Sequence, residues 1–215
     1  MDYYEKIEYK KCSIELYFDE NPEDPREWDN FGTMICFHNN YNLGDKTDLT
    51  SDDFEGWDEL KSYLKKEKHA EIVAPLYMYD HSGIRIKIGD FYNCGLAQGH
   101  ARFDSGQIGF IYVSKKKILE EYGGKKLTEA KLRKAKKCLE TEIKNYDKHV
   151  SGQVYGFMAK DENGDDLDSC WGFYDEDFMI DEAKRQIDWE LEQRTIKKCQ
   201  KTKNLIKNNV ALNYR

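Results

Sequence analysis

The segment Gln153–Tyr174 reads QVYGFMAKDENGDDLDSCWGFY and carries the clearest structural signal in the sequence. Asn163-Gly164, near its centre, is the dipeptide favoured in a two-residue type I′ turn, in which both residues need positive φ. Apolar and aromatic residues stand on both sides of this dipeptide. We therefore predict a β-hairpin in which Gln153–Lys160 pairs with Leu167–Tyr174.

Pairing outward from that turn places Gly156 opposite Trp171 and Tyr155 opposite Gly172. A large aromatic ring that covers a bare glycine across a strand pair stabilises a sheet. Both faces of the hairpin carry apolar side chains, so neither face is marked as exposed to solvent. We expect the hairpin to lie inside a sheet that is covered on both sides.

Alternation of apolar and polar residues indicates further strands. In Ile84–Ile88 three isoleucines alternate with two basic residues, which is typical of an antiparallel strand with one exposed face. Residues 80–83, Asp-His-Ser-Gly, are a suitable turn into this strand. Four other strands are expected at Ile72–Tyr79, Gln107–Val113, Ser13–Phe18 and Thr33–Phe37.

Apolar residues at spacings of three and four predict three helices. The strongest pattern covers Leu127–Val150, with Thr128 as a candidate cap near its start. A short charged helix is expected over Trp57–Lys68, and a C-terminal helix with one apolar stripe begins near Phe178. The sequence thus predicts an α+β fold, in which a mainly antiparallel sheet of six or seven strands packs against a long central helix and a C-terminal helix. We expect one domain over residues 1–200 and a Lys- and Asn-rich tail over residues 201–215.

The composition indicates a cytoplasmic protein without a membrane span. Of the 215 residues, 39% are hydrophobic and 13% aromatic, which suffices for a folded core. The first residues show no secretory signal, and no segment approaches the ~20 apolar residues that span a bilayer. The six cysteines stand singly, without C-x-x-C spacing, and phosphate-loop and dinucleotide-binding motifs are missing. We expect no cofactor and no metal site.

Charge is strongly segregated along the chain, whose net charge is −7. Three acidic segments, Glu15–Asn30, Asp45–Glu59 and Asp161–Glu182, carry −6, −6 and −10. Two basic segments, Lys115–Lys148 and Lys184–Arg215, carry +6 each. Most acids therefore fall in predicted loops and most bases on predicted helices.

Acidic loops attract cationic partners and speed encounter with them. They repel nucleic-acid phosphates, so we expect no direct nucleic-acid binding, and the partner would be a protein with a basic groove. An exposed Trp beside carboxylates would anchor such an interface. The candidate partner-binding residues are Glu23, Asp24, Glu27, Trp28, Asp29, Asp52, Asp53, Asp165, Asp166 and Asp168. The alternative is that the acidic loops serve solubility alone and that Trp28 packs on the core.

A catalytic alternative rests on His81, His100 and Asp104. A histidine oriented by a carboxylate can act as a general base, provided the groups come within hydrogen-bond reach. The sequence brings no G-x-S-x-G nucleophile motif to this neighbourhood. Turn chemistry also explains these residues, so an enzyme is the less favoured class.

Five stretches carry a resemblance to a family: Trp28–His38, Tyr41–Asp45, Leu76–Gly83, Asp104–Val113 and Asp168–Tyr174. They resemble hypothetical proteins carried by bacteriophages and other mobile elements, over most of residues 28–175. The resemblance implies a context, counter-defence against the host, and it implies no site residues.

Three functional hypotheses follow. The first is an anti-CRISPR or anti-restriction type of inhibitor, which binds a host nuclease through DNA-mimicking acidic loops. The second is a small metal- or His-dependent hydrolase or nuclease. The third is an accessory protein that self-associates through Leu127–Val150 or the C-terminal helix.

Overall fold

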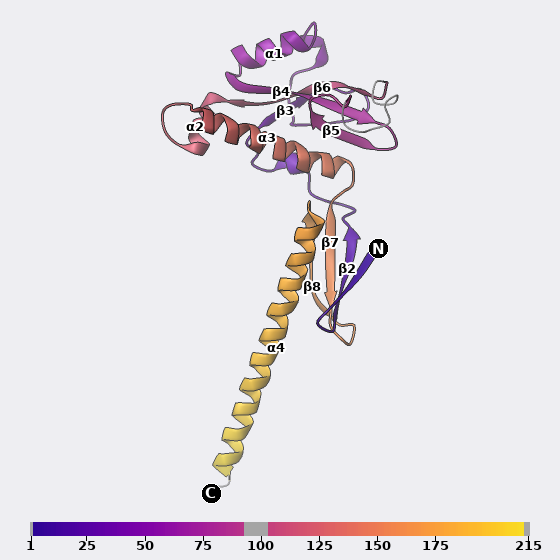
Figure 1. The fold of residues 1–215 in the computed structure, drawn as a ribbon, viewed down its shortest axis with the longest axis vertical. Helices are drawn as coiled ribbons and strands as arrows, with labels where there is room; N and C mark the ends of the chain where they lie inside the picture. Colours follow the sequence, from indigo (N-terminus) through magenta and orange to yellow (C-terminus); the bar gives the residue numbers. More distant parts are fainter. Residues whose placement is uncertain (1, 93–102, 213–215) are drawn as a thin grey trace. The chain divides into compact units, whose positions relative to one another are not determined.

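The computed structural model of the protein describes residues 2–92 and 103–212 (Figure 1). The chain divides into two compact units. The terminal unit combines Met1–Pro22 with Gln153–Arg215, and the central unit comprises Glu23–Gly152. This differs from the single domain expected over residues 1–200, because the strand Cys12–Phe18 pairs with the strand Tyr155–Lys160. The last helix also passes through position 201 without a break.

The terminal unit is built on a four-stranded antiparallel sheet, the terminal sheet. Its strand order is β1 (Glu5–Tyr9), β2 (Cys12–Phe18), β7 (Tyr155–Lys160) and β8 (Asp166–Phe173). The long helix α4 (Glu176–Leu212) packs on one face of this sheet and extends beyond it (Figure 1). The buried residues of this layer are Cys12, Ile14, Leu16, Phe157, Ala159, Met179, Ala183 and Ile187.

The predicted hairpin is confirmed, and its aromatic cover is present. A Cβ atom added to Gly156 would lie 2.1 Å from the Trp171 ring, so the indole occupies the space that a side chain would need. The pairing shifts beyond this point, because Gly172 adopts a φ of +82° in a bulge. Tyr155 consequently pairs with Phe173 and not with Gly172 as expected.

The turn of this hairpin is longer than a two-residue type I′ turn. Gly164 has a φ of +85°, whereas Asn163 is not in the left-handed region. The Gly164 amide donates to the carbonyl of Asp161, and the Asp161 amide donates to the carbonyl of Asp165. The Asp161 carboxylate also accepts hydrogen bonds from the amides of Asn163 and Asp165. This side chain organises the loop, which explains the departure from the predicted turn.

The expectation of a sheet covered on both sides is wrong for the hairpin. Strand β8 is an edge strand, and α4 is the helix that packs on this sheet within the described residues. The other face carries a patch of rings in which Trp171 lies 5.6 Å from Tyr17 and Tyr3 lies 6.4 Å from Tyr17. Aromatic rings partly shield this face, so its composition resembles that of a buried strand.

The central unit contains a second four-stranded antiparallel sheet, the central sheet. Its order is β3 (Thr33–Cys36), β6 (Ser105–Ser114), β4 (Ala70–Asp80) and β5 (Ile84–Ile88). All four strands match the predicted ones closely. Gly109 in β6 allows β3 to approach, because a Cβ atom there would lie 1.9 Å from the Ile35 carbonyl oxygen.

Helices cover both faces of the central sheet (Figure 1). Helix α1 (Trp57–Lys66) packs on the face that carries Ile35 and Phe110, and helix α3 (Glu129–Val150) packs on the opposite face. A further helix, α2 (Lys115–Tyr122), follows β6 directly. The sequence analysis missed α2 and β1, because both are short and strongly charged.

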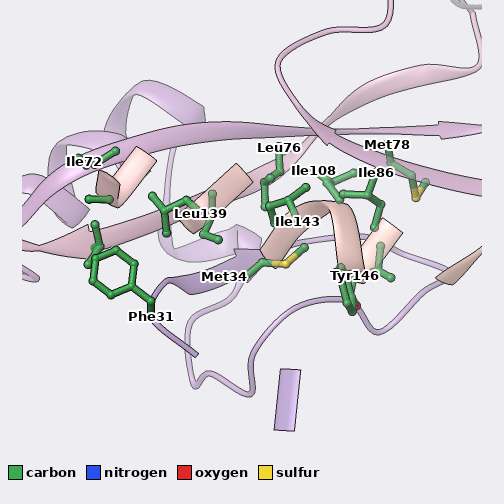
Figure 2. Close-up of a cluster of buried hydrophobic side chains, with 14 of the residues drawn as sticks. Phe31, Met34, Ile72, Leu76, Met78, Ile86, Ile108, Leu139, Ile143 and Tyr146 are labelled. Carbon is green, nitrogen blue, oxygen red and sulfur yellow. The ribbon is translucent and has the colours of Figure 1, made fainter. Parts of the chain in front are cut away.

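The α3 face holds the largest buried cluster of the described residues (Figure 2). Leu139 and Ile143 of α3 point into the layer between the helix and the sheet, where they meet Met34 and Leu76. The spacing of three and four that predicted α3 is therefore the spacing of its buried face.

The described residues contain four α-helices and eight strands in two antiparallel sheets. The α+β class and the long C-terminal helix are confirmed. The expected single sheet is instead divided between the two units, because β2 pairs with β1 and β7, whereas β3 pairs with β6. Among the described residues, no helix combines the length and apolar character that crossing a bilayer requires.

Candidate functional site

Arg26 is the centre of a buried ionic network in the central unit. It lies in the short 3-10 helix η1 (Pro25–Glu27), which Asp24 caps by accepting from the Arg26 amide at 2.8 Å. Its side chain is 2% exposed, and the guanidinium donates to Asp45 through Nε at 2.6 Å and through Nη2 at 2.9 Å. It also lies 3.3 Å from Glu142 of α3 and donates to the Gly32 carbonyl at 2.8 Å.

The two carboxylates also hold the backbone of β3 and of the residues that precede it. Asp45 accepts from the Met34 amide at 2.9 Å, and Glu142 accepts from the Phe31 amide at 2.6 Å. Burial lowers the pKa of the Arg26 guanidinium, but the hydrogen bonds and charge of Asp45 and the charge of Glu142 outweigh it and raise that pKa. The guanidinium therefore stays charged and ties the loops to α3.

This network brings two of the three acidic segments together. Arg26 joins the first segment to Asp45 at the start of the second, and the exposed Glu27 lies 3.3 Å from Lys46 beside it. Residues 23–30 and 45–59 of the central unit hold eleven acids and two bases. The start of the second acidic segment therefore lies against the loop of residues 23–30.

An open groove lies between the second acidic segment and α1, and we call it the acidic groove. Its volume is about 620 Å³. Its lining residues are Asp48, Leu49, Asp53, Phe54, Glu59, Ser62, Tyr63, Lys66 and Glu67. Four carboxylates and one ammonium group thus surround two aromatic rings. Such a groove suits a cationic side chain with an apolar stem.

Local hydrogen bonds hold two of the carboxylates in place. Asp53 belongs to the 3-10 helix η2 (Ser51–Asp53), and its carboxylate accepts from the Thr50 amide at 2.7 Å in a capping box. Glu59, in the first turn of α1, accepts from the Glu55 amide at 2.6 Å. The carboxylates are therefore positioned by the backbone of the same loop that forms the groove wall.

An aromatic cluster adjoins the acidic groove through Phe54. The Phe37 ring stacks with those of Phe54 and Trp57 at 6.3 Å each, and Phe54 meets Tyr63 edge-on at 5.4 Å. The rings of Phe37, Phe54 and Trp57 line a small apolar cavity of about 100 Å³ beside Leu60. Aromatic faces attract guanidinium and ammonium groups, which adds to the attraction of the carboxylates.

The predicted partner-binding residues divide between the two units. Asp53 lines the acidic groove, and its neighbour Asp52 is exposed in η2. The loop that carries Trp28 lies beside the second acidic segment, and Trp28 is 46% exposed, so it is not a core residue. The other predicted partner-binding residues in this loop are Glu23, Asp24, Glu27 and Asp29. The residues Asp165, Asp166 and Asp168 belong to the hairpin of the terminal unit and do not line the groove.

The catalytic alternative is supported by one contact. The Nδ1 atom of His81 lies 3.0 Å from Oδ2 of Asp104, across the turn that precedes β5. His100 lies outside the described residues. A His–Asp pair orients an imidazole for proton transfer, but it needs a nucleophile or a metal-bound water. Among the described residues, no three His, Cys, Asp or Glu side chains group closely enough to hold a metal ion.

The chain matches no protein-family model, no curated protein and no solved structure. The resemblance to proteins of phages and mobile elements therefore stays a prediction. Function has to be inferred from the geometry of the residues themselves.

Sequence reasoning missed the aromatic residues of the groove. The sequence analysis singled out neither Phe54 nor Tyr63, and Arg26 was counted only as the single base of an acidic segment. One signal was available: aromatic residues alternate with acids over residues 52–59, DDFEGWDE. The role of Glu142 gave no local signal, because it stands 116 residues from Arg26.

Proposed function

We propose that the protein acts by binding a cationic segment of another protein in the acidic groove. The observation that carries this proposal is the lining of the groove, where Asp48, Asp53, Glu59 and Glu67 stand around Phe54 and Tyr63. Carboxylates supply attraction and orientation, while the rings accept the apolar stem of a lysine or the plane of an arginine. This favours a binding protein over an enzyme.

Charge alone gives modest affinity at such a site. An exposed ion pair contributes about 0.2–1 kcal/mol, so several pairs and the aromatic contacts must act together. Salt screens exposed charges over ~10 Å at 0.1 M, and association should therefore weaken as salt rises. The groove and the neighbouring loop of residues 23–30 together present enough acids to steer a basic partner.

Phosphate groups are repelled by the same surface, so the favoured partner is a protein whose basic groove normally holds nucleic acid. If the acidic groove binds a cationic segment that lines the partner's basic groove, the nucleic acid can no longer enter that basic groove. Together with the resemblance to proteins of phages and mobile elements, this supports a counter-defence inhibitor of the anti-CRISPR or anti-restriction type, acting in the host cytoplasm.

The test measures DNA cleavage by a panel of purified CRISPR effector nucleases and restriction enzymes with increasing amounts of the protein. We expect inhibition of a panel member, reduced at least tenfold by the double substitution Asp48→Lys with Glu67→Lys. The matched control, Glu121→Lys with Glu140→Lys, changes the charge equally on α2 and α3, away from the groove lining, and should inhibit like the wild type.

A second readout uses a fluorescent oligoarginine peptide and measures its binding by polarisation. Salt-dependent binding that the groove variant loses and the control keeps would support the proposal. Absence of inhibition across the panel, together with peptide binding that the groove variant retains, would contradict it.

A small hydrolase or nuclease is the second candidate, favoured by the 3.0 Å contact between His81 and Asp104. Turnover of nucleic acids and nucleotides, measured with and without Mg²⁺ or Zn²⁺, tests it. Activity that His81→Ala abolishes would support an enzyme. No turnover with either metal would contradict it.

A further inference from the structure

The outer face of α4, opposite the face that packs on the terminal sheet, carries a second apolar stripe. Its exposed members are Phe178, Trp189, Ile196, Cys199 and Ile206. These positions belong to one series with alternating spacings of four and three residues from 178 to 206, which is the a and d pattern of a coiled coil. The other positions of the series carry charged side chains.

The stripe is not a by-product of packing on the sheet. The buried α4 residues Met179, Ala183 and Ile187 face the sheet, on the opposite side of the helix. Trp189 is 55% exposed although it lies beside the packed part of the helix, and Phe178, which is equally exposed, contacts the sheet only at its edge, where its ring lies 6.2 Å from that of Phe173. Large apolar side chains in such a row mark a surface that another element covers.

The second half of α4 lies beyond the sheet (Figure 1). Arg194 bonds Asp161 at the hairpin turn at 2.8 Å, and the side chains of residues 195–207 are all exposed. An isolated helix of roughly 12–15 residues is only marginally stable in water, because packing supplies most helical stability in proteins. A partner along this half would supply that packing.

The charge of α4 changes sign along its length. Residues 176–192 carry seven acids and two bases, a net −5, while residues 193–212 carry six bases and no acid, a net +6. Parallel pairing of two such helices would place like charges together. Antiparallel pairing would place the acidic half of each helix against the basic half of the other.

We propose that two copies of this chain associate through the outer faces of α4, in antiparallel orientation and crossing near Gln193. The apolar stripe provides the contact, and the opposed charges select the orientation. This interface shares no residue with the acidic groove, so either can fail without the other.

Sedimentation equilibrium over a range of concentrations tests the association. We expect a reversible dimer that dissociates more readily at high salt. Lys197→Glu with Lys201→Glu and Lys203→Glu should raise the dissociation constant at least tenfold. The matched control, Arg133→Glu with Lys136→Glu and Lys137→Glu, makes the same charge change on exposed positions of α3 and should leave the dimer intact.

A charge-swap experiment separates lost pairing from lost folding. A second variant, Asp181→Lys with Glu190→Lys and Glu192→Lys, should also be monomeric. Mixing it with the variant that carries Lys197→Glu, Lys201→Glu and Lys203→Glu should restore a dimer, because opposite charges again face each other. A wild type that stays monomeric at all concentrations, or variants that fail to pair when mixed, would overturn the proposal.

Orientation is tested by a spin label on Lys207→Cys in a chain whose Cys94 and Cys170 are replaced by serine and whose Cys199, a member of the stripe, is replaced by the apolar residue alanine. Position 207 lies 14 residues from the crossing point, so at 1.5 Å per residue the two labels should be about 40 Å apart in an antiparallel pair. A distance below about 20 Å, as neighbouring parallel helices would give, overturns the antiparallel arrangement.

Discussion

The two sheets of this protein have the same strand number and different covering. Helices α1 and α3 cover both faces of the central sheet, whereas α4 covers one face of the terminal sheet. On the central sheet the side chains of successive residues, such as Met34 and Ile35, are both buried, in separate clusters. The difference teaches that an apolar pattern in a strand does not by itself show whether helices cover one face or both faces of its sheet.

The buried charged groups of the two units also differ in their surroundings. In the central unit the Arg26 guanidinium is enclosed by loop and helix and is held by two carboxylates. On the open face of the terminal sheet, Glu15 accepts from Tyr17 at 2.9 Å and lies 2.7 Å from Lys160. The first network holds separate elements together, and the second seals a face that no helix covers within the described residues.

The largest expected effect comes from removing the buried cation. Arg26→Met leaves Asp45 and Glu142 close together without a counter-charge, and breaking such a buried pair costs about 3–5 kcal/mol of unfolding free energy. Urea denaturation monitored by circular dichroism measures it. Neutralising all three groups, as Arg26→Met with Asp45→Asn and Glu142→Gln, should recover more than half of that loss. A single variant as stable as the wild type would contradict the role of the network.

The next effect compares one glycine from each sheet. Overpacking typically costs about 1–3 kcal/mol, and Gly109→Ala should reach the upper end because its Cβ meets the Ile35 backbone oxygen, which cannot move independently. Gly156→Ala should fall near the lower end, because its Cβ meets the Trp171 side chain on an edge strand. Thermal unfolding of both variants measures the order. Equal losses would mean that the edge is as rigid as the interior.

A smaller effect concerns pH and the open face of the terminal sheet. The hydrogen bond from Lys160 lowers the pKa of Glu15, and that of Tyr17 acts in the same direction. A lowered folded-state pKa stabilises the protein above the unfolded value, about 4.3 for glutamate, and this contribution is lost as pH falls through the folded value. Urea midpoints of Glu15→Gln and wild type should therefore differ at pH 7 and converge at acidic pH. A constant difference would contradict this.

The smallest effect comes from the exposed neighbour of the buried network. Glu27 and Lys46 are paired at 3.3 Å but are 68% and 92% exposed. Glu27→Gln should change the free energy of unfolding by less than about 1 kcal/mol. Measured beside Arg26→Met in the same denaturation series, it shows whether burial sets the strength of the ionic contacts in this loop.

The sequence by itself determined most of the local structure. The alternation of isoleucines identified β5 at its observed bounds, and the spacing of apolar residues in α3 matched its buried face. Gly156 under Trp171 was also visible in the sequence, because the hairpin register follows from the turn. Short charged elements such as α2 were not predicted, since their stability comes from contacts with residues that are distant in the sequence.

The sequence predicted the acidic character of the candidate site but not the groove that its residues form. Asp53 was identified from the density of acids, whereas Phe54 and Tyr63 line one groove only because α1 lies across the loop. The assignment of Asp165 to a different unit from Asp53 depends on β7 pairing with β2.

The tertiary structure alone decided which distant residues meet. Arg26, Asp45 and Glu142 form one network only after the loop of the central unit has folded against α3. Local patterns follow from the geometry of single helices and strands, which repeats every few residues. Partners across a core depend on the packing of several elements at once, and no short stretch of sequence contains that information.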